Sequence, residues 1–116
     1  MSTAGVITYK INADWSLDGR WTHPDVAGKT GTEKASGGVG GLGGVREVQI
    51  YGPDGSQIAA GSLTIAAEGD RYALTWSVSE GGRQSVFTGV GLIDASGSLA
   101  ACFQEKEPSL QEPQAQ

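Results

Sequence analysis

Strict alternation of residue types between Arg71 and Val78 is the feature that most limits how this chain can fold. Large apolar or aromatic residues occupy every second position, and small or polar residues lie between them: Tyr72, Leu74, Trp76 and Val78 against Ala73, Thr75 and Ser77. A period of two is typical of a β-strand with one face in the interior. The strand lies within residues 61–103, which divide into four short strands separated by turn signals.

The pair Gly81-Gly82 predicts a hairpin after this strand. A two-residue turn or a four-residue loop over 79–82 gives the same parity, and it places Phe87, Gly89 and Gly91 on the face of Tyr72, Leu74 and Trp76. Large rings would then lie opposite glycines, as in sheets that curve. A loop of odd length would instead turn Val86, Thr88 and Val90 to that face.

Further alternating segments cover residues 5–12, 14–22, 45–51, 56–67, 84–93 and 98–103, with turn residues between them. About six to eight short strands without a significant helix predict an all-β domain. Hairpins between sequence neighbours favour an up-and-down order. The frequent glycines favour a curved sheet that closes on itself. We therefore predict a small, single-domain antiparallel β-barrel over residues 1–103.

Two segments fall outside the strand pattern. Residues 23–44 are rich in glycine and have only isolated apolar positions, which predicts one long flexible loop or a mobile lid. Residues 104–116 are rich in Gln, Glu and Pro, which predicts a disordered tail.

Composition excludes several classes of function. The formal net charge of −5 disfavours nucleic-acid binding, and no run approaches the roughly 20 apolar residues of a membrane helix. The single Cys102 allows no disulfide or cysteine-based zinc site, and its alternating strand suggests a small packed residue. One histidine cannot build a multi-histidine metal site, so neither metal nor cofactor is expected. Without a signal-peptide pattern we expect a cytoplasmic protein.

Motifs associated with catalysis or nucleotide binding lack the required context. Gly28-Lys29-Thr30 is not preceded by the glycine of a phosphate-binding loop, and residues 38–43 match G-x-G-x-x-G without a preceding strand and following helix. His23 and Asp25 are the only catalytic candidates, and no nucleophile can be placed beside them by spacing. We favour a non-catalytic protein.

Aromatic residues provide the strongest functional candidates. Five of them are predicted to share one interior: Trp15, Trp21, Tyr72, Trp76 and Phe87. Core packing explains such a set, and so does a ligand cavity with polar groups such as Tyr9 or Thr88, because an eight-stranded barrel either fills its interior or holds one small ligand. The leading hypothesis is a binding module for a small, mostly apolar ligand. The alternative is a structural or protein–protein interaction protein, a homodimer through strand edges with a packed core.

The segment Leu17-Asp18-Gly19-Arg20-Trp21 resembles the glycine-x-tryptophan opening of lipocalins and avidins, the calycin group of ligand-binding barrels. The resemblance implies a barrel in which Trp21 packs across the closed end. Avidins carry a biotin-contacting asparagine two residues after this tryptophan, and this chain has His23 there, so no binding residue carries over. Segments of the carboxyl half also resemble short glycine-rich β repeats of uncharacterised bacterial proteins.

Overall fold

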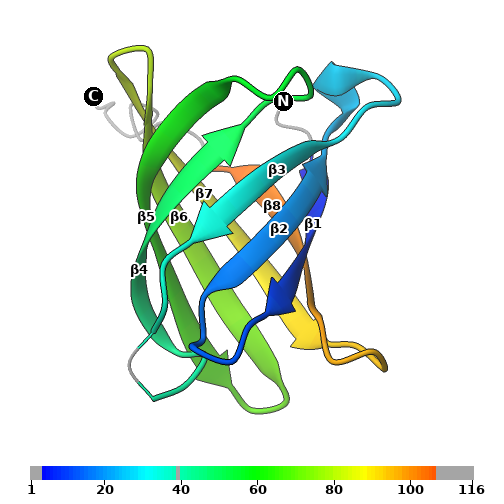
Figure 1. The fold of residues 1–116 in the computed structure, drawn as a ribbon, viewed down its shortest axis with the longest axis vertical. Helices are drawn as coiled ribbons and strands as arrows, with labels where there is room; N and C mark the ends of the chain where they lie inside the picture. The colour runs from blue at the N-terminus through cyan, green and yellow to red at the C-terminus, as the bar shows by residue number, and fades with distance from the viewer. Residues whose placement is uncertain (1–3, 39, 107–116) are drawn as a thin grey trace, which may run out of the picture.

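A computed structural model describes residues 4–38 and 40–106. These residues form a closed antiparallel barrel in which eight strands follow one another in chain order (Figure 1). The strands are β1 (Ala4–Ile11), β2 (Leu17–Thr22), β3 (Gly31–Ala35), β4 (Gly44–Tyr51), β5 (Gln57–Glu68), β6 (Arg71–Glu80), β7 (Arg83–Ile93) and β8 (Leu99–Glu105). The predicted all-β, up-and-down barrel is confirmed. The described residues contain no α-helix, and one short 3₁₀ turn, η1 (Pro24–Val26), follows β2.

Strand β3 corrects the prediction of one structureless loop over residues 23–44. Its residues pair with β2 on one side and β4 on the other, so the barrel would not close without it. Three side-chain positions of β3 face inward and are buried, namely Gly31, Glu33 and Ala35. None of the three is a large apolar residue. The alternation is therefore present in β3 but does not show as a hydrophobic pattern.

The β6–β7 hairpin has the predicted even register. A two-residue turn at Gly81 and Gly82 joins the strands, and both glycines have positive φ, 58° and 86°. Across the hairpin, Tyr72 lies opposite Gly91, Leu74 opposite Gly89 and Trp76 opposite Phe87. At Gly89 an added Cβ would come within 1.9 Å of the Cys102 carbonyl oxygen, so only glycine allows β8 to lie this close.

Three of the interstrand loops share one backbone conformation. In the β1–β2, β4–β5 and β7–β8 loops, the first residue donates its N–H to the fifth residue's carbonyl, and the fourth donates to the first. The fourth residue has positive φ in each loop, 67° at Trp15 and 87° at both Gly55 and Gly97. This is the form of a hairpin whose turn ends in a left-handed residue. Trp15 thus occupies a position that the other two loops give to glycine.

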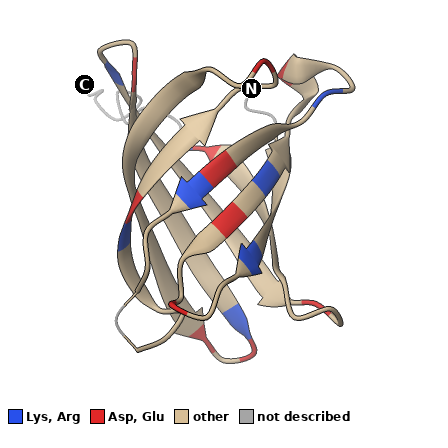
Figure 2. Ribbon diagram, in the orientation of Figure 1, with Lys and Arg blue, Asp and Glu red and all other residues tan. Residues whose placement is uncertain are grey.

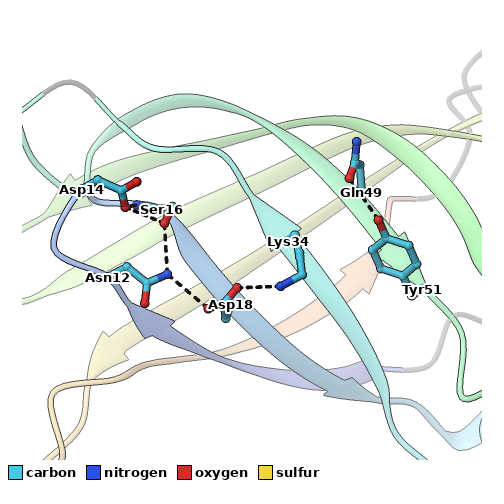
Figure 3. Close-up of polar contacts among 7 residues, drawn as sticks. All are labelled: Asn12, Asp14, Ser16, Asp18, Lys34, Gln49 and Tyr51. Atoms are coloured by element: carbon cyan, nitrogen blue, oxygen red, sulfur yellow. Dashed lines mark hydrogen bonds and ion pairs between the residues drawn. The ribbon is translucent and has the colours of Figure 1, made fainter. Parts of the chain in front are cut away.

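Side-chain hydrogen bonds brace the β1–β2 loop on the outside of the barrel (Figure 3). The Asp14 carboxylate accepts from the Ser16 backbone N–H at 3.0 Å and from its hydroxyl at 2.6 Å. The amide of Asn12 donates to Ser16 and to Asp18, and Lys34 on β3 pairs with Asp18 at 3.2 Å. These contacts tie the loop to the outer face of β2 and β3. The hydrogen bonds from Ser16 hold the pKa of Asp14 below its usual value.

Arg46 closes the end of the barrel that carries the β1–β2 loop. Its side chain is buried, with 2% of the residue exposed, and it points inward from β4. The guanidinium donates to the carbonyl oxygens of Leu42 at 2.5 Å, Gly41 at 3.1 Å and Trp15 at 3.1 Å. One side chain therefore joins the β1–β2 loop to the glycine-rich loop before β4. Burial lowers the pKa of this guanidinium.

Two further predictions concern the carboxyl end. Cys102 is exposed on the outer face of β8, so the expectation that it packs in the interior is wrong. Strand β8 runs to Glu105, so Gln104 and Glu105 belong to the barrel rather than to the predicted tail. Residues 107–116 of that tail lie outside the described residues. In the described part of the chain, no helix has the length and apolar character needed to span a membrane.

Candidate functional site

A cavity of about 540 Å³ occupies the barrel interior at the end opposite Arg46. This end carries η1 and the β4–β5 and β6–β7 turns (Figure 1). The walls are mostly apolar and aromatic, with side chains from six strands: Ile7, Trp21, Ile50, Trp76, Phe87 and Phe103. Exposed side chains such as Asp25 and Arg83 also line it, so the cavity opens to solvent at this end.

Glycines opposite aromatic residues make room for the rings along the cavity wall. Trp21 on β2 lies directly across from Gly31, and a Cβ there would meet the indole ring at 2.4 Å. Phe103 on β8 lies across from Gly5 on β1, and a Cβ added at Gly5 would meet the phenyl ring at 2.3 Å. Each ring therefore occupies the space that a side chain on the neighbouring strand would need. The result is an aromatic lining around an open space.

Glu33, Tyr9 and Trp76 form a hydrogen-bonded cluster on the inner side of the cavity. The Tyr9 hydroxyl donates to Glu33 Oε2 at 2.5 Å. The indole N–H of Trp76 is shared between the Tyr9 oxygen at 3.0 Å and Glu33 Oε2 at 3.2 Å. All three residues are buried, and Glu33 and Trp76 line the cavity. The cluster joins β1, β3 and β6 across the interior.

Burial dominates the electrostatics of this cluster. It raises the pKa of Glu33 from 4.5 to about 7, and the hydrogen bonds from Tyr9 and Trp76 offset part of the effect. Burial and the neighbouring Glu33 carboxylate raise the pKa of Tyr9 well above its usual value. No ion pair to Glu33 is found among residues 4–38 and 40–106. Glu33 is therefore a buried acid that changes charge near neutral pH.

The mouth of the cavity carries four charged residues, three of them acidic: Asp25, Glu80, Glu105 and Arg83. Arg83 pairs with Glu105 at 3.2 Å across β7 and β8. Together with Glu33, the cavity lining contains four carboxylates and one guanidinium. The mouth is therefore negatively charged.

His23 and Asp25 lie beside each other at the mouth. His23 Nδ1 accepts the Asp25 backbone N–H at 3.1 Å, and the Asp25 carboxylate lies 3.5 Å from the same nitrogen. The imidazole stacks on Phe103, with ring centres 6.1 Å apart. This contact places the η1 segment against β8 at the cavity rim. Within the described ranges, no group of three or more His, Cys, Asp or Glu side chains is arranged to hold a metal ion.

Three of the five aromatic residues singled out from the sequence line the cavity, namely Trp21, Trp76 and Phe87. Tyr72 is half-buried against the core but does not line the cavity. Trp15 lies in the β1–β2 loop at the Arg46 end and is 37% exposed. The expected packing of Trp21 across the closed end is also wrong, because Trp21 lines the open end and Arg46 closes the other.

Sequence reasoning missed Glu33 because it assigned residues 23–44 to a loop. The available signal was the alternation of Gly31, Glu33 and Ala35 with Thr32 and Lys34, which face outward. Of the two polar groups considered for a cavity, Tyr9 faces the interior and Thr88 is exposed on the outside of β7.

These features define the protein as a small closed antiparallel β-barrel with one plugged end and one open, aromatic-lined end. Comparisons with protein families, curated proteins and solved structures found no match.

Proposed function

We propose that this protein is a non-catalytic binding module that holds a small, mostly apolar ligand inside the barrel. The observation that carries the proposal is the cavity of about 540 Å³. Ligand pockets are typically about 300–1,000 Å³, with apolar and aromatic walls and a few polar groups that orient the ligand. Glu33, Tyr9 and Trp76 are the polar groups available here.

The proposed role agrees with the resemblance of the Gly19-x-Trp21 segment to calycin barrels. We also propose that the protein is bacterial and cytoplasmic. The arrangement of rings over glycines explains why this cavity exists. A barrel of eight strands can fill its interior with side chains. Here Trp21 and Phe103 lie over Gly31 and Gly5 instead, and the space at the open end is left for another molecule.

Binding of N-phenyl-1-naphthylamine, a neutral probe whose fluorescence rises in apolar surroundings, tests the proposal. The wild-type protein is expected to bind it with a saturable increase in fluorescence. Ile50 lines the cavity on β4, next to its strand partner Glu33 on β3, so Ile50→Trp fills the space and is expected to weaken binding by at least about tenfold.

Val45→Trp is the matched control, because Val45 lies on the same strand but is 69% exposed. This variant should bind the probe as the wild type does. Absence of saturable binding by the wild type, or equal loss in both variants, would contradict the proposal. If the probe binds as expected, native mass spectrometry of protein purified from its own source would identify the natural ligand.

A second candidate function is assembly through the outer wall of β5–β8. Charged residues lie on β1–β4 and at the two barrel ends, while the middle of β5–β8 carries none (Figure 2). Val6, Cys102 and Val90 are exposed and lie in one row across β1, β8 and β7, with Leu92 two positions beyond Val90. Each strand of the described barrel has a neighbour on both sides, so we place the proposed contact on the outer wall instead of on a strand edge. The occupant we propose for this face is a second copy of the chain.

Analytical ultracentrifugation tests this candidate. The wild type would sediment as a dimer, and Val90→Lys would shift it to a monomer because the charge would be buried in the interface. Val45→Lys, on the exposed face of β4, is the control and would leave the dimer intact. A wild-type monomer at all concentrations would rule this candidate out.

A further inference from the structure

We propose that the cavity is selective for a small organic cation, an amine with an apolar body whose ammonium group binds the Glu33 carboxylate. This inference rests on the proposed binding function and names the chemical class of its ligand. Three independent features of the cavity carry it: an unneutralised buried carboxyl group, aromatic faces around it, and a negative mouth.

One oxygen of the Glu33 carboxyl group, Oε1, accepts no hydrogen bond from the described residues. Both hydrogen bonds to the carboxyl group, from Tyr9 and Trp76, end on Oε2. The residue is 2% exposed, and its side chain contributes to the cavity lining. A buried carboxylate without a cation is costly, and a ligand ammonium would supply both the missing charge and a hydrogen-bond donor.

The rings around the cavity suit a cation with an apolar body. Trp21, Phe87 and Phe103 line the cavity together with Trp76. Phe103 contacts the rings of Trp76 and Phe87 edge to face, at 6.0 Å in each case. Aromatic faces attract ammonium groups through their electron-rich centres and pack against apolar groups at the same time.

The charge at the mouth favours entry of a cation over an anion. Asp25, Glu80 and Glu105 face one guanidinium, Arg83, which is already paired with Glu105. A cavity lined by one sign of charge raises the local concentration of ligands of the opposite sign. A ligand carboxylate, which a neutral Glu33 would also accept by donating a hydrogen bond, would meet repulsion at the mouth.

The test uses three probes that differ only in the end group: 4-phenylbutylamine, 4-phenylbutanol and 4-phenylbutyrate. Affinities of the full-length protein are measured by isothermal titration calorimetry at pH 8, where an alkyl amine remains charged. The amine is expected to bind at least about tenfold more tightly than the alcohol, and the carboxylate more weakly than either.

Glu33→Gln removes the charge and keeps the shape of the side chain. This variant is expected to bind the amine no more tightly than the alcohol, while its affinity for the alcohol stays within about twofold of wild type. Glu47→Gln is the matched control. It makes the same change in net charge on the outer face of β4, and it should retain the preference for the amine.

A pH series on the wild type gives a second readout that does not depend on a variant folding. Because the pKa of Glu33 is about 7, its carboxylate is mostly neutral at pH 6 and mostly charged at pH 8, so amine affinity should rise about tenfold between them. Tyr9 and Trp76 face Glu33 directly, and Arg46 acts on Tyr9 from β4. The other ionisable groups lining the cavity are His23, Asp25, Glu80, Arg83 and Glu105.

The outcomes separate the two proposals. Equal affinity for amine and alcohol, tightest binding of the carboxylate, or an amine affinity that does not change with pH would overturn the cation inference and leave the binding function standing. Failure of all three probes and of N-phenyl-1-naphthylamine to bind would overturn both.

Discussion

Glu33 makes the stability of the folded barrel depend on pH. Its pKa in the folded barrel is about 7, against 4.5 for an ordinary glutamate, because burial disfavours the charged form. The folded state therefore keeps a proton that the unfolded chain releases at lower pH. The stabilisation is fully present below about pH 4.5 and is lost as the pH rises through 7.

We expect the free energy of unfolding to fall between pH 5 and pH 8 by up to about 3 kcal/mol more in the wild type than in Glu33→Gln. The glutamine variant cannot ionise, so it should be the more stable protein at pH 8. Urea unfolding of both proteins at a series of pH values measures the difference. Parallel pH profiles would show that Glu33 is not the titrating group.

Trp15 has a left-handed backbone conformation that residues with a Cβ usually avoid. Its φ of 67° matches that of Gly55 and Gly97 at the same position of two other loops. A left-handed conformation costs a residue with a Cβ roughly 1–2 kcal/mol. The Trp15 carbonyl oxygen is used by Arg46, so the conformation of this loop also matters for the closed end.

Trp15→Gly is therefore expected to be more stable than Trp15→Ala by about 1 kcal/mol. Both variants remove the indole ring, and only glycine relieves the left-handed backbone. Thermal and urea unfolding of the pair give the comparison. A less stable glycine variant would contradict it, because it would mean that the flexibility of glycine in the unfolded chain outweighs the relief.

At the scale of elements, the strands that could be predicted were those that bury large apolar residues at alternate positions. Strands β1, β2, β4, β5, β6 and β8 fall in this group. Strand β7 also alternates, but its inward face carries Ser85, Phe87, Gly89 and Gly91, and its register followed from the Gly81-Gly82 turn. Strand β3 buries Gly31, Glu33 and Ala35, so hydrophobicity could not reveal it. Its place is fixed by pairing with neighbours on both sides, which is information about the whole barrel.

Gly31→Ala tests how β3 supports the cavity wall. The new methyl group would meet the Trp21 ring at 2.4 Å and the Tyr51 carbonyl oxygen at 2.5 Å, so the ring must move into the cavity. We expect a loss of about 1–3 kcal/mol in stability, a shift in tryptophan emission and weaker binding of N-phenyl-1-naphthylamine. Gly28→Ala is the matched control for added volume, because nothing lies within 4 Å of a Cβ there. Gly28 has positive φ, so this variant should lose stability but keep the tryptophan emission and the probe affinity of the wild type.

At the scale of the whole molecule, the two ends of the barrel are built differently. A guanidinium and backbone carbonyls fill one end, and aromatic rings leave the other open. The sequence predicted a barrel and an aromatic interior, yet it did not decide between a packed core and a cavity. The reason is that Trp15 and Trp21 follow the same alternation but lie at opposite ends, and alternation does not report depth along the barrel axis.

Arg46→Lys tests whether the closed end stabilises the fold without affecting binding at the open end. An ammonium group cannot reach the three carbonyl oxygens that the guanidinium binds, so we expect a loss of about 2–4 kcal/mol in stability. Affinity for N-phenyl-1-naphthylamine should stay near that of wild type, measured where the variant is fully folded. A large loss of affinity in the folded variant would mean that the two ends are coupled.

The plug formed by Arg46 has a consequence for exchange kinetics. A site with a single entrance cannot admit a second molecule until the first has left. The rate at which a bound molecule dissociates should therefore be independent of the concentration of a competitor added to displace it. For a ligand bound as proposed, retention would be set at the rim, where His23 stacks on Phe103.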